Sequence, residues 1–123
     1  MSIVVTGAAG ALGSIVARGL HASGHPVCLM DRPDALEGLD ALRAELGERC
    51  ERIALDVASA EGWKSALVQT EGALGQIQGA ALVAGGWQGG ERLHEMEDDA
   101  VWDAMLQINL QTANVCMVLD PWW

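Results

Sequence analysis

The stretch that decides the fold reads Thr6-Gly7-Ala8-Ala9-Gly10-Ala11-Leu12-Gly13. It follows a short apolar run and precedes an amphipathic helical pattern. Glycines at three-residue intervals let a chain turn tightly, let its backbone approach a pyrophosphate closely, and let helix and strand pack together. The N–H groups at the start of such a helix, with the helix dipole, bind an anion without any basic side chain. The stretch therefore predicts a dinucleotide site, with a purely structural tight turn as the alternative.

Four apolar runs alternate with longer helical patterns along the chain. The runs cover residues 3–5, 27–30, 53–55 and 80–83. Each run is continuous, as expected for strands that are buried on both faces of a parallel sheet. Because crossovers between parallel strands are right-handed, we expect one α/β domain over residues 1–123, a doubly wound parallel sheet with strand order 3-2-1-4.

The helical patterns predict which side chains face this sheet. In the first helix, an apolar stripe is formed by Leu12, Ile15, Val16, Gly19 and Leu20. The last helix is predicted to open at the acidic residues 97–99, which are favourable at a helix N-terminus, and to run toward Leu119. Its apolar surface is broader than one stripe, so part of it is expected to be an interface.

Polar side chains at the ends of the predicted strands suggest further cofactor contacts. Asp31 can accept hydrogen bonds from a ribose diol and would repel a 2′-phosphate, which favours NAD over NADP; the neighbouring Arg32 weakens this preference. Asp56 and Val57 follow the third strand, where the adenine would lie. For both aspartates, a role in capping a helix or forming a turn is the alternative. The small side chains of residues 84–86 would let a cofactor pass closely, and a plain loop is the alternative there.

These features together resemble the amino-terminal half of a short-chain dehydrogenase/reductase. The resemblance rests on the glycine turn, Asp31, the Asp56-Val57 pair and Ile108-Asn109-Leu110. Residues 83–90 are also similar to dihydropteridine reductase. The family implies a Rossmann fold and hydride transfer between NAD(P) and a small carbonyl or alcohol. The expected cofactor-binding residues are Thr6, Gly7, Ala9, Gly10, Ala11, Leu12, Gly13, Asp31, Arg32, Asp56, Val57, Ala84, Gly85 and Gly86.

The catalytic residues that the resemblance implies are mostly missing. Family members carry a Ser and a Tyr-x-x-x-Lys pair, whereas this chain of 123 residues has no Tyr. Only Asn109 matches the catalytic tetrad, and a packing or capping role is its alternative. We therefore expect a Rossmann domain that is truncated at its carboxyl end, binds NAD and is inactive alone. The alternative is a non-catalytic nucleotide-sensing or protein-interaction module.

The composition of the chain limits the classes of partner that it is expected to bind. Seven basic residues against seventeen acidic ones give a formal charge of −10, which argues against nucleic-acid binding. No signal peptide or membrane span is apparent, so a cytoplasmic protein with no membrane partner is expected. The three cysteines and three histidines show no metal-ligand spacing, so no metal is expected. Self-association is expected through the last helix or the open edge of the fourth strand.

Overall fold

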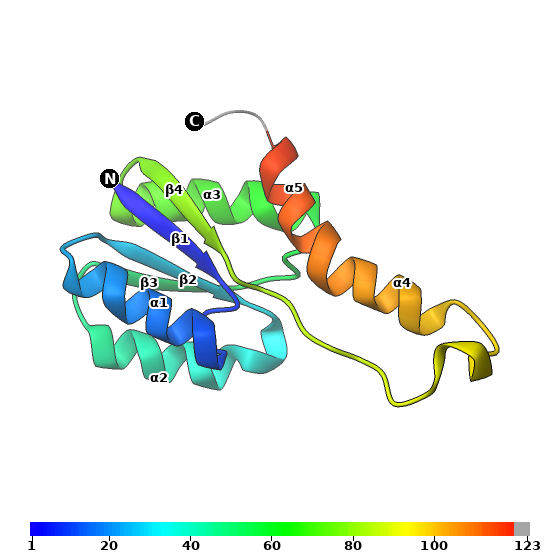
Figure 1. The fold of residues 1–123 in the computed structure, drawn as a ribbon. Helices are drawn as coiled ribbons and strands as arrows, with labels where there is room; N and C mark the ends of the chain where they lie inside the picture. Colours follow the sequence, from blue (N-terminus) through cyan, green and yellow to red (C-terminus); the bar gives the residue numbers. More distant parts are fainter. Residues whose placement is uncertain (120–123) are drawn as a thin grey trace.

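Four parallel strands form one sheet with helices on both faces (Figure 1). A computed structural model of the chain describes residues 1–119. The strands are β1 (Ser2–Thr6), β2 (Val27–Asp31), β3 (Cys50–Ala54) and β4 (Ile77–Leu82). The helices are α1 (Ala11–Ala22), α2 (Leu36–Leu46), α3 (Ala60–Leu74), α4 (Ala100–Leu106) and α5 (Thr112–Val118), with short 3-10 helices η1 (Pro33–Ala35) and η2 (Leu93–Glu95) and a π-helical segment η3 (Gln107–Gln111).

The strand order is β3-β2-β1-β4, which confirms the predicted fold class and topology. All three strand pairs are parallel, and in the centre Val4 of β1 lies beside Cys28 of β2 and Ala80 of β4. The carboxyl ends of the strands therefore meet at one edge of the sheet. In open sheets of this kind, the crevice outside these ends is where ligands bind.

The sheet has a separate apolar core on each face. Alternate residues of β1 point to opposite faces, so Val4 belongs to one core and Val5 to the other, and both are fully buried. Trp63 of α3 and Cys116 of α5 pack on the Val4 side, whereas Ala17 of α1 packs on the Val5 side. Burial on both faces explains why the strands read as continuous apolar runs.

The first helix faces the sheet with smaller residues than its apolar stripe predicts. Leu12 and Ile15 are 63% and 65% exposed, so their predicted inward orientation is wrong. The buried positions of α1 are instead Gly13 and Ala17. A Cβ on Gly13 would lie only 2.0 Å from the Gly7 carbonyl oxygen. The start of α1 therefore packs too closely on the preceding turn for a larger side chain at this position, and Leu12 and Ile15 lie on the outward side of the helix.

The last helix is interrupted by a π-helical turn that the sequence pattern does not predict. It begins at Ala100, whose N–H donates to Asp98 Oδ1 at 2.9 Å, and so it starts close to the predicted acidic cluster. The η3 segment then adds a wider turn before α5. In Figure 1, α5 packs over the sheet beside α3, whereas α4 and the preceding loop project beyond the sheet. Among residues 1–119, no helix is both long enough and apolar enough to cross a bilayer.

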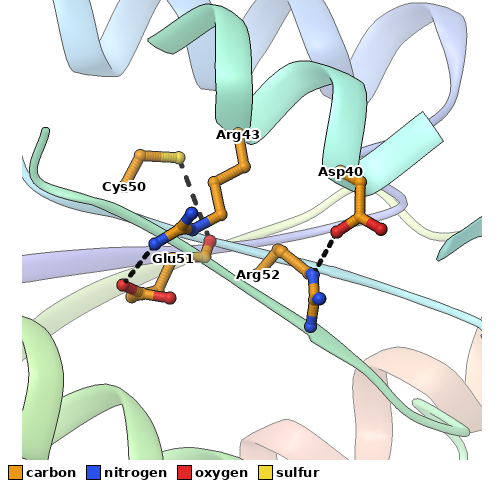
Figure 2. A network of polar contacts seen from close by, with 5 residues as sticks. All are labelled: Asp40, Arg43, Cys50, Glu51 and Arg52. Carbon is orange, nitrogen blue, oxygen red and sulfur yellow. Dashed lines mark hydrogen bonds and ion pairs between the residues drawn. The ribbon is translucent and has the colours of Figure 1, made fainter. Parts of the chain in front are cut away.

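Two ion pairs link α2 to the edge strand β3 (Figure 2). Arg43 Nη2 lies 3.0 Å from Glu51 Oε1, and Arg52 pairs with Asp40. All four side chains are partly exposed, so each pair contributes at most about 1 kcal/mol. The edge strand is held mainly by its ladder with β2 and by apolar packing under α2.

Candidate functional site

A cavity of about 480 Å³ opens at the carboxyl ends of the strands. This volume lies within the roughly 300–1,000 Å³ typical of small-molecule sites. The lining residues come from the β1–α1 turn, the ends of β2, β3 and β4 with the residues that follow them, the π-helical segment η3 and the first residue of α5. They are Gly7, Ala9, Gly10, Ala11, Leu12, Gly13, Asp31, Arg32, Ala35, Asp56, Val57, Ala58, Val83, Ala84, Gly85, Gln107, Ile108 and Thr112.

The floor of the cavity is the turn between β1 and α1. Gly7 has a φ of +64°, and a Cβ there would lie 2.9 Å from backbone atoms of Ala84. The turn closes when the Gly10 N–H donates to the Gly7 carbonyl at 3.0 Å. Gly10 is also the N-cap of α1 and supplies no side-chain hydrogen bond to the helix. The first turn of α1 is therefore uncapped at the cavity, which is the arrangement that binds a phosphate group.

Asp31 joins the end of β2 to the glycine turn. Its Oδ2 accepts a hydrogen bond from the Ala9 N–H at 3.0 Å, and its Oδ1 accepts from the Arg32 N–H at 2.9 Å. Each carboxylate oxygen has a second lone pair that can still accept from a ligand. The adjacent Arg32 guanidinium lies 2.9 Å from Asp34, with both side chains largely exposed. The rim of the cavity therefore presents a fixed carboxylate beside an exposed arginine that pairs with Asp34.

The wall after β3 is fixed by a buried tryptophan. The Trp63 indole N–H donates to the Val57 carbonyl at 2.7 Å, and the Trp63 side chain is fully buried. Asp56 Oδ1 accepts from the Ala58 N–H at 2.9 Å, which closes the turn into α3. Ser59 caps that helix by accepting from the Gly62 N–H. The backbone of Asp56 and Val57 is thus held in one conformation at the cavity.

The loop after β4 is held by Asn109 from the π-helical segment. Asn109 Oδ1 accepts from the Gly86 N–H at 3.0 Å, and Nδ2 donates to the carbonyls of Gly86 at 2.9 Å and Met105 at 3.1 Å. A Cβ on Gly85 would lie 2.7 Å from Asn109 Oδ1, so a larger residue there would displace the Asn109 side chain from its hydrogen bonds to the loop. At the start of the loop, the Ala84 N–H donates to Thr6 Oγ1 at 3.1 Å.

The three cysteines are unpaired and buried, and their thiols are unreactive at neutral pH. Burial raises the pKa of the thiols of Cys28, Cys50 and Cys116 to about 11, so they are protonated near neutral pH. Thr70 Oγ1 also donates to Cys28 Sγ at 3.2 Å. Within residues 1–119, no three His, Cys, Asp or Glu side chains are grouped as a metal site would require.

A family model described as short chain dehydrogenase matches residues 1–119. The chain belongs to the short-chain dehydrogenase family. It is 35% identical over 107 residues to nodulation protein G of Rhizobium meliloti, covering 87% of this chain and 42% of that protein. The chain therefore spans less than half the length of this curated relative.

Solved structures of short-chain dehydrogenases share the fold. A closed form of serine dehydrogenase complexed with NADP+ matches with a TM-score of 0.84 and 26% identity, over 95% of this chain and 46% of that one. A glucose/ribitol dehydrogenase from Brucella melitensis matches with a TM-score of 0.83 and 33% identity, over 94% of this chain and 48% of that one. The part shared with these enzymes is the Rossmann-like sheet, and the family binds NAD or NADP.

Most of the residues predicted from the short-chain dehydrogenase pattern line the cavity. Thr6 and Gly86 do not line it; Thr6 supports Ala84, and Gly86 is bound by Asn109. Asn109 is likewise absent from the lining and holds the loop instead.

Six lining positions were not predicted: Ala35, Ala58, Val83, Gln107, Ile108 and Thr112. Ala58 and Val83 directly adjoin predicted residues, so adjacency was the available signal for these two, whereas Ala35 lies at the end of η1, three residues after Arg32. The other three come from the last helix, whose π turn sets which side chains reach the cavity.

Proposed function

We propose that this chain is the NAD-binding Rossmann domain of a short-chain dehydrogenase, with residues 1–123 as one domain. The observation that carries the proposal is the uncapped start of α1 against a glycine-lined floor at the carboxyl edge of the sheet. A side chain at Gly7 or Gly13 would meet backbone atoms at 2.9 Å or less, so the glycines serve close approach rather than flexibility. The residues present therefore fit a dinucleotide.

Each part of the dinucleotide has a matching group in the cavity. The pyrophosphate would be held by the N–H groups of the first turn of α1. The adenosine ribose would be held by Asp31, and the adenine would lie against Asp56 and Val57. The nicotinamide half would extend along residues 83–86, where small residues leave room. When bound, the nicotinamide supplies the hydride that short-chain dehydrogenases exchange with a carbonyl or alcohol.

NAD rather than NADP is the proposed cofactor. The carboxylate of Asp31 is fixed by two backbone N–H groups at the end of β2, where it would repel a 2′-phosphate. Arg32 is the cation that could offset this repulsion, but its guanidinium is paired with Asp34. The serine dehydrogenase matched above is complexed with NADP+, so the choice rests on these residues of this chain and not on the family.

We propose that the chain alone turns over no substrate. It contains no Tyr, and the family's acid/base is a tyrosine. The carboxamide of Asn109 is occupied by Gly86 and Met105, which supports a role in positioning the β4 loop. The proposed setting is the cytoplasm, where unpaired thiols such as the three buried cysteines persist.

Self-association is a second property that the exposed helix surface favours. Trp102 and Leu110 are 63% and 61% exposed, and Leu106 and Met117 are exposed as well. These four large apolar side chains are spread along the last helix, from α4 through η3 to α5. A large exposed apolar patch on a protein usually marks a contact with another protein. A second copy of this chain is the proposed occupant, and the alternative reading as an interaction module would use the same surface. Sedimentation velocity of the wild-type chain and of Trp102→Glu measures the degree of self-association, and we expect the variant to shift toward monomer.

The test of cofactor binding is calorimetric titration of the wild type and Asp31→Asn with NADH and NADPH. A hydrogen bond to a charged group is worth about 1.5–3 kcal/mol, so the variant should bind NADH roughly ten- to a hundredfold more weakly. Its NADPH affinity should stay level or rise because the repulsion is removed. Glu37→Gln is the matched control, since Glu37 is an exposed carboxylate near the start of α2 that does not line the cavity. Equal losses for both cofactors would contradict the assignment of Asp31.

A further inference from the structure

Trp63 is the largest fully buried side chain among residues 1–119, and it does not itself line the cavity. Its ring lies in the α3–α5 core, which also contains the side chains of Leu55 and Val57. The buried indole N–H donates to the Val57 carbonyl at 2.7 Å. Because Val57 does line the cavity, Trp63 contacts the cavity wall from the core side.

The segment that Trp63 holds is the turn between β3 and α3. Residues 56–58 of this turn all line the cavity. The turn is anchored just before them, because the Leu55 N–H donates to the Asp31 carbonyl at 2.9 Å and so extends the pairing of β3 with β2. Two residues further along, the Val57 carbonyl accepts the indole bond. The cavity-lining part of the turn thus begins at a sheet hydrogen bond and is held in its middle by Trp63.

The hydrogen bonds of this turn differ in their access to water. The bond from the Ala58 N–H to Asp56 Oδ1 is exposed, so water can replace either partner when it breaks. The bond from Trp63 to the Val57 carbonyl is buried, so breaking it leaves polar groups without a partner. A buried polar group left unsatisfied costs about 1–3 kcal/mol, whereas a typical hydrogen bond contributes only about 0.5–1.5 kcal/mol. The indole therefore restrains the turn more strongly than the exposed bond does.

A ligand binds more tightly to a wall that is already in place. A wall that fluctuates has to be ordered when the ligand binds, and this ordering lowers the affinity. We propose that Trp63 is a positioning residue for the dinucleotide. Its indole N–H holds the Val57 carbonyl and thereby keeps residues 56–58 in the conformation that the cofactor contacts. The proposal rests on the proposed function, since it requires a dinucleotide in the cavity.

The test compares Trp63→Phe with Thr70→Val. Phenylalanine keeps an aromatic ring in the core but lacks the N–H. Thr70 is fully buried on the same helix, its Oγ1 lies 2.8 Å from the Ala66 carbonyl oxygen, and it does not line the cavity. Thr70→Val therefore removes a buried hydrogen-bond donor from α3 without touching the wall. Urea denaturation measures the stability of each protein, and calorimetric titration of the folded protein measures its affinity for NADH.

Both variants should be less stable than the wild type, but only Trp63→Phe should lose affinity for NADH, by about three- to tenfold. Hydrogen exchange at the Ala58 amide should quicken in Trp63→Phe alone. Folded Trp63→Phe that binds NADH as tightly as the wild type, or an equal loss of affinity in Thr70→Val, would overturn the inference while leaving dinucleotide binding intact. Wild-type protein that does not bind NADH would overturn the proposed function and this inference together.

A measurement on the wild type tests the same contact if Trp63→Phe does not fold. The NMR signal of the Trp63 indole N–H is sensitive to its hydrogen bond with Val57, and the exposed Trp102 supplies a reference signal. Saturation with NADH should shift the Trp63 signal, because the cofactor contacts the turn that accepts this bond, and should leave the Trp102 signal unchanged. A Trp63 signal that does not move at saturating NADH would overturn the inference.

Discussion

The β1–α1 turn and the β4–α4 loop both reach the cavity, but they are held in place by different contacts. The turn is fixed by close backbone packing, since a Cβ on Gly13 would lie 2.0 Å from the Gly7 oxygen. The loop is fixed mainly by the side chain of one exposed residue, Asn109. The turn keeps its conformation because the surrounding backbone leaves no room for another one. The loop keeps its conformation only as long as a few side-chain hydrogen bonds are intact.

The largest effect should come from filling the turn. Gly13→Ala places a methyl group within 3.0 Å of the backbone of Gly7 and Ala8, which cannot move without separating α1 from β1. Overpacking of this kind costs about 3 kcal/mol of unfolding free energy. Urea denaturation measures the loss, and NADH affinity should fall with it because the start of α1 moves.

A matched glycine in the same helix gives the control. Gly19 of α1 has open space where a Cβ would be, so Gly19→Ala should stabilise the protein by about 0.5–1 kcal/mol through helix propensity. If Gly13→Ala were as stable as the wild type, close packing would not be what fixes the turn.

The two cores can be compared through their thiols. Cys50 lies in the α1–α2 core, and Cys28 and Cys116 lie in the α3–α5 core. Burial raises the pKa of each thiol from 9.0 to about 11 in the folded state. Between pH 9 and 11 the unfolded chain therefore ionises while the folded chain does not. Stability should fall as pH rises through this window, by roughly 1.4 kcal/mol per thiol at pH 10.

Denaturation of the wild type and Cys116→Ala at pH 8 and pH 10 measures the contribution of α5. The pH-dependent loss should be smaller in the variant by the share of one thiol. An identical loss in both proteins would mean that Cys116 titrates normally and that α5 packs more loosely than the α1–α2 side.

The smallest effect should come from the loop. Asn109→Ala removes hydrogen bonds to Gly86 and Met105, but the site is exposed, so the cost should be about 1 kcal/mol. Hydrogen exchange at the Gly86 amide should quicken more than exchange in β1. Asn114→Ala, at an exposed position of α5, is the control and should change neither quantity. Slow exchange at Gly86 in the Asn109 variant would show that other contacts hold the loop.

The same contrast explains how far the sequence predicts the structure. The glycine spacing and the continuous apolar runs predict the turn, the strand order and most of the cavity lining, because these depend on local backbone geometry and burial. The exposure of Leu12 and the π turn at Gln107 were not predicted. The first depends on how closely the start of α1 packs on the backbone of Gly7 and Ala8, and the second on how the last helix meets the β4 loop. Hydrophobic periodicity alone reports neither contact.

The most direct test of the central claim is amide NMR of the wild-type chain during titration with NADH. We expect saturable changes in the amide chemical shifts of Ala9 to Gly13 at the start of α1, and of Val57 and Ala84. The chemical shifts of amides near Trp102 and Leu110, on the exposed surface of the last helix, should not change. A dispersed spectrum of folded protein in which the amides of the glycine turn do not respond to NADH would contradict dinucleotide binding at the start of α1.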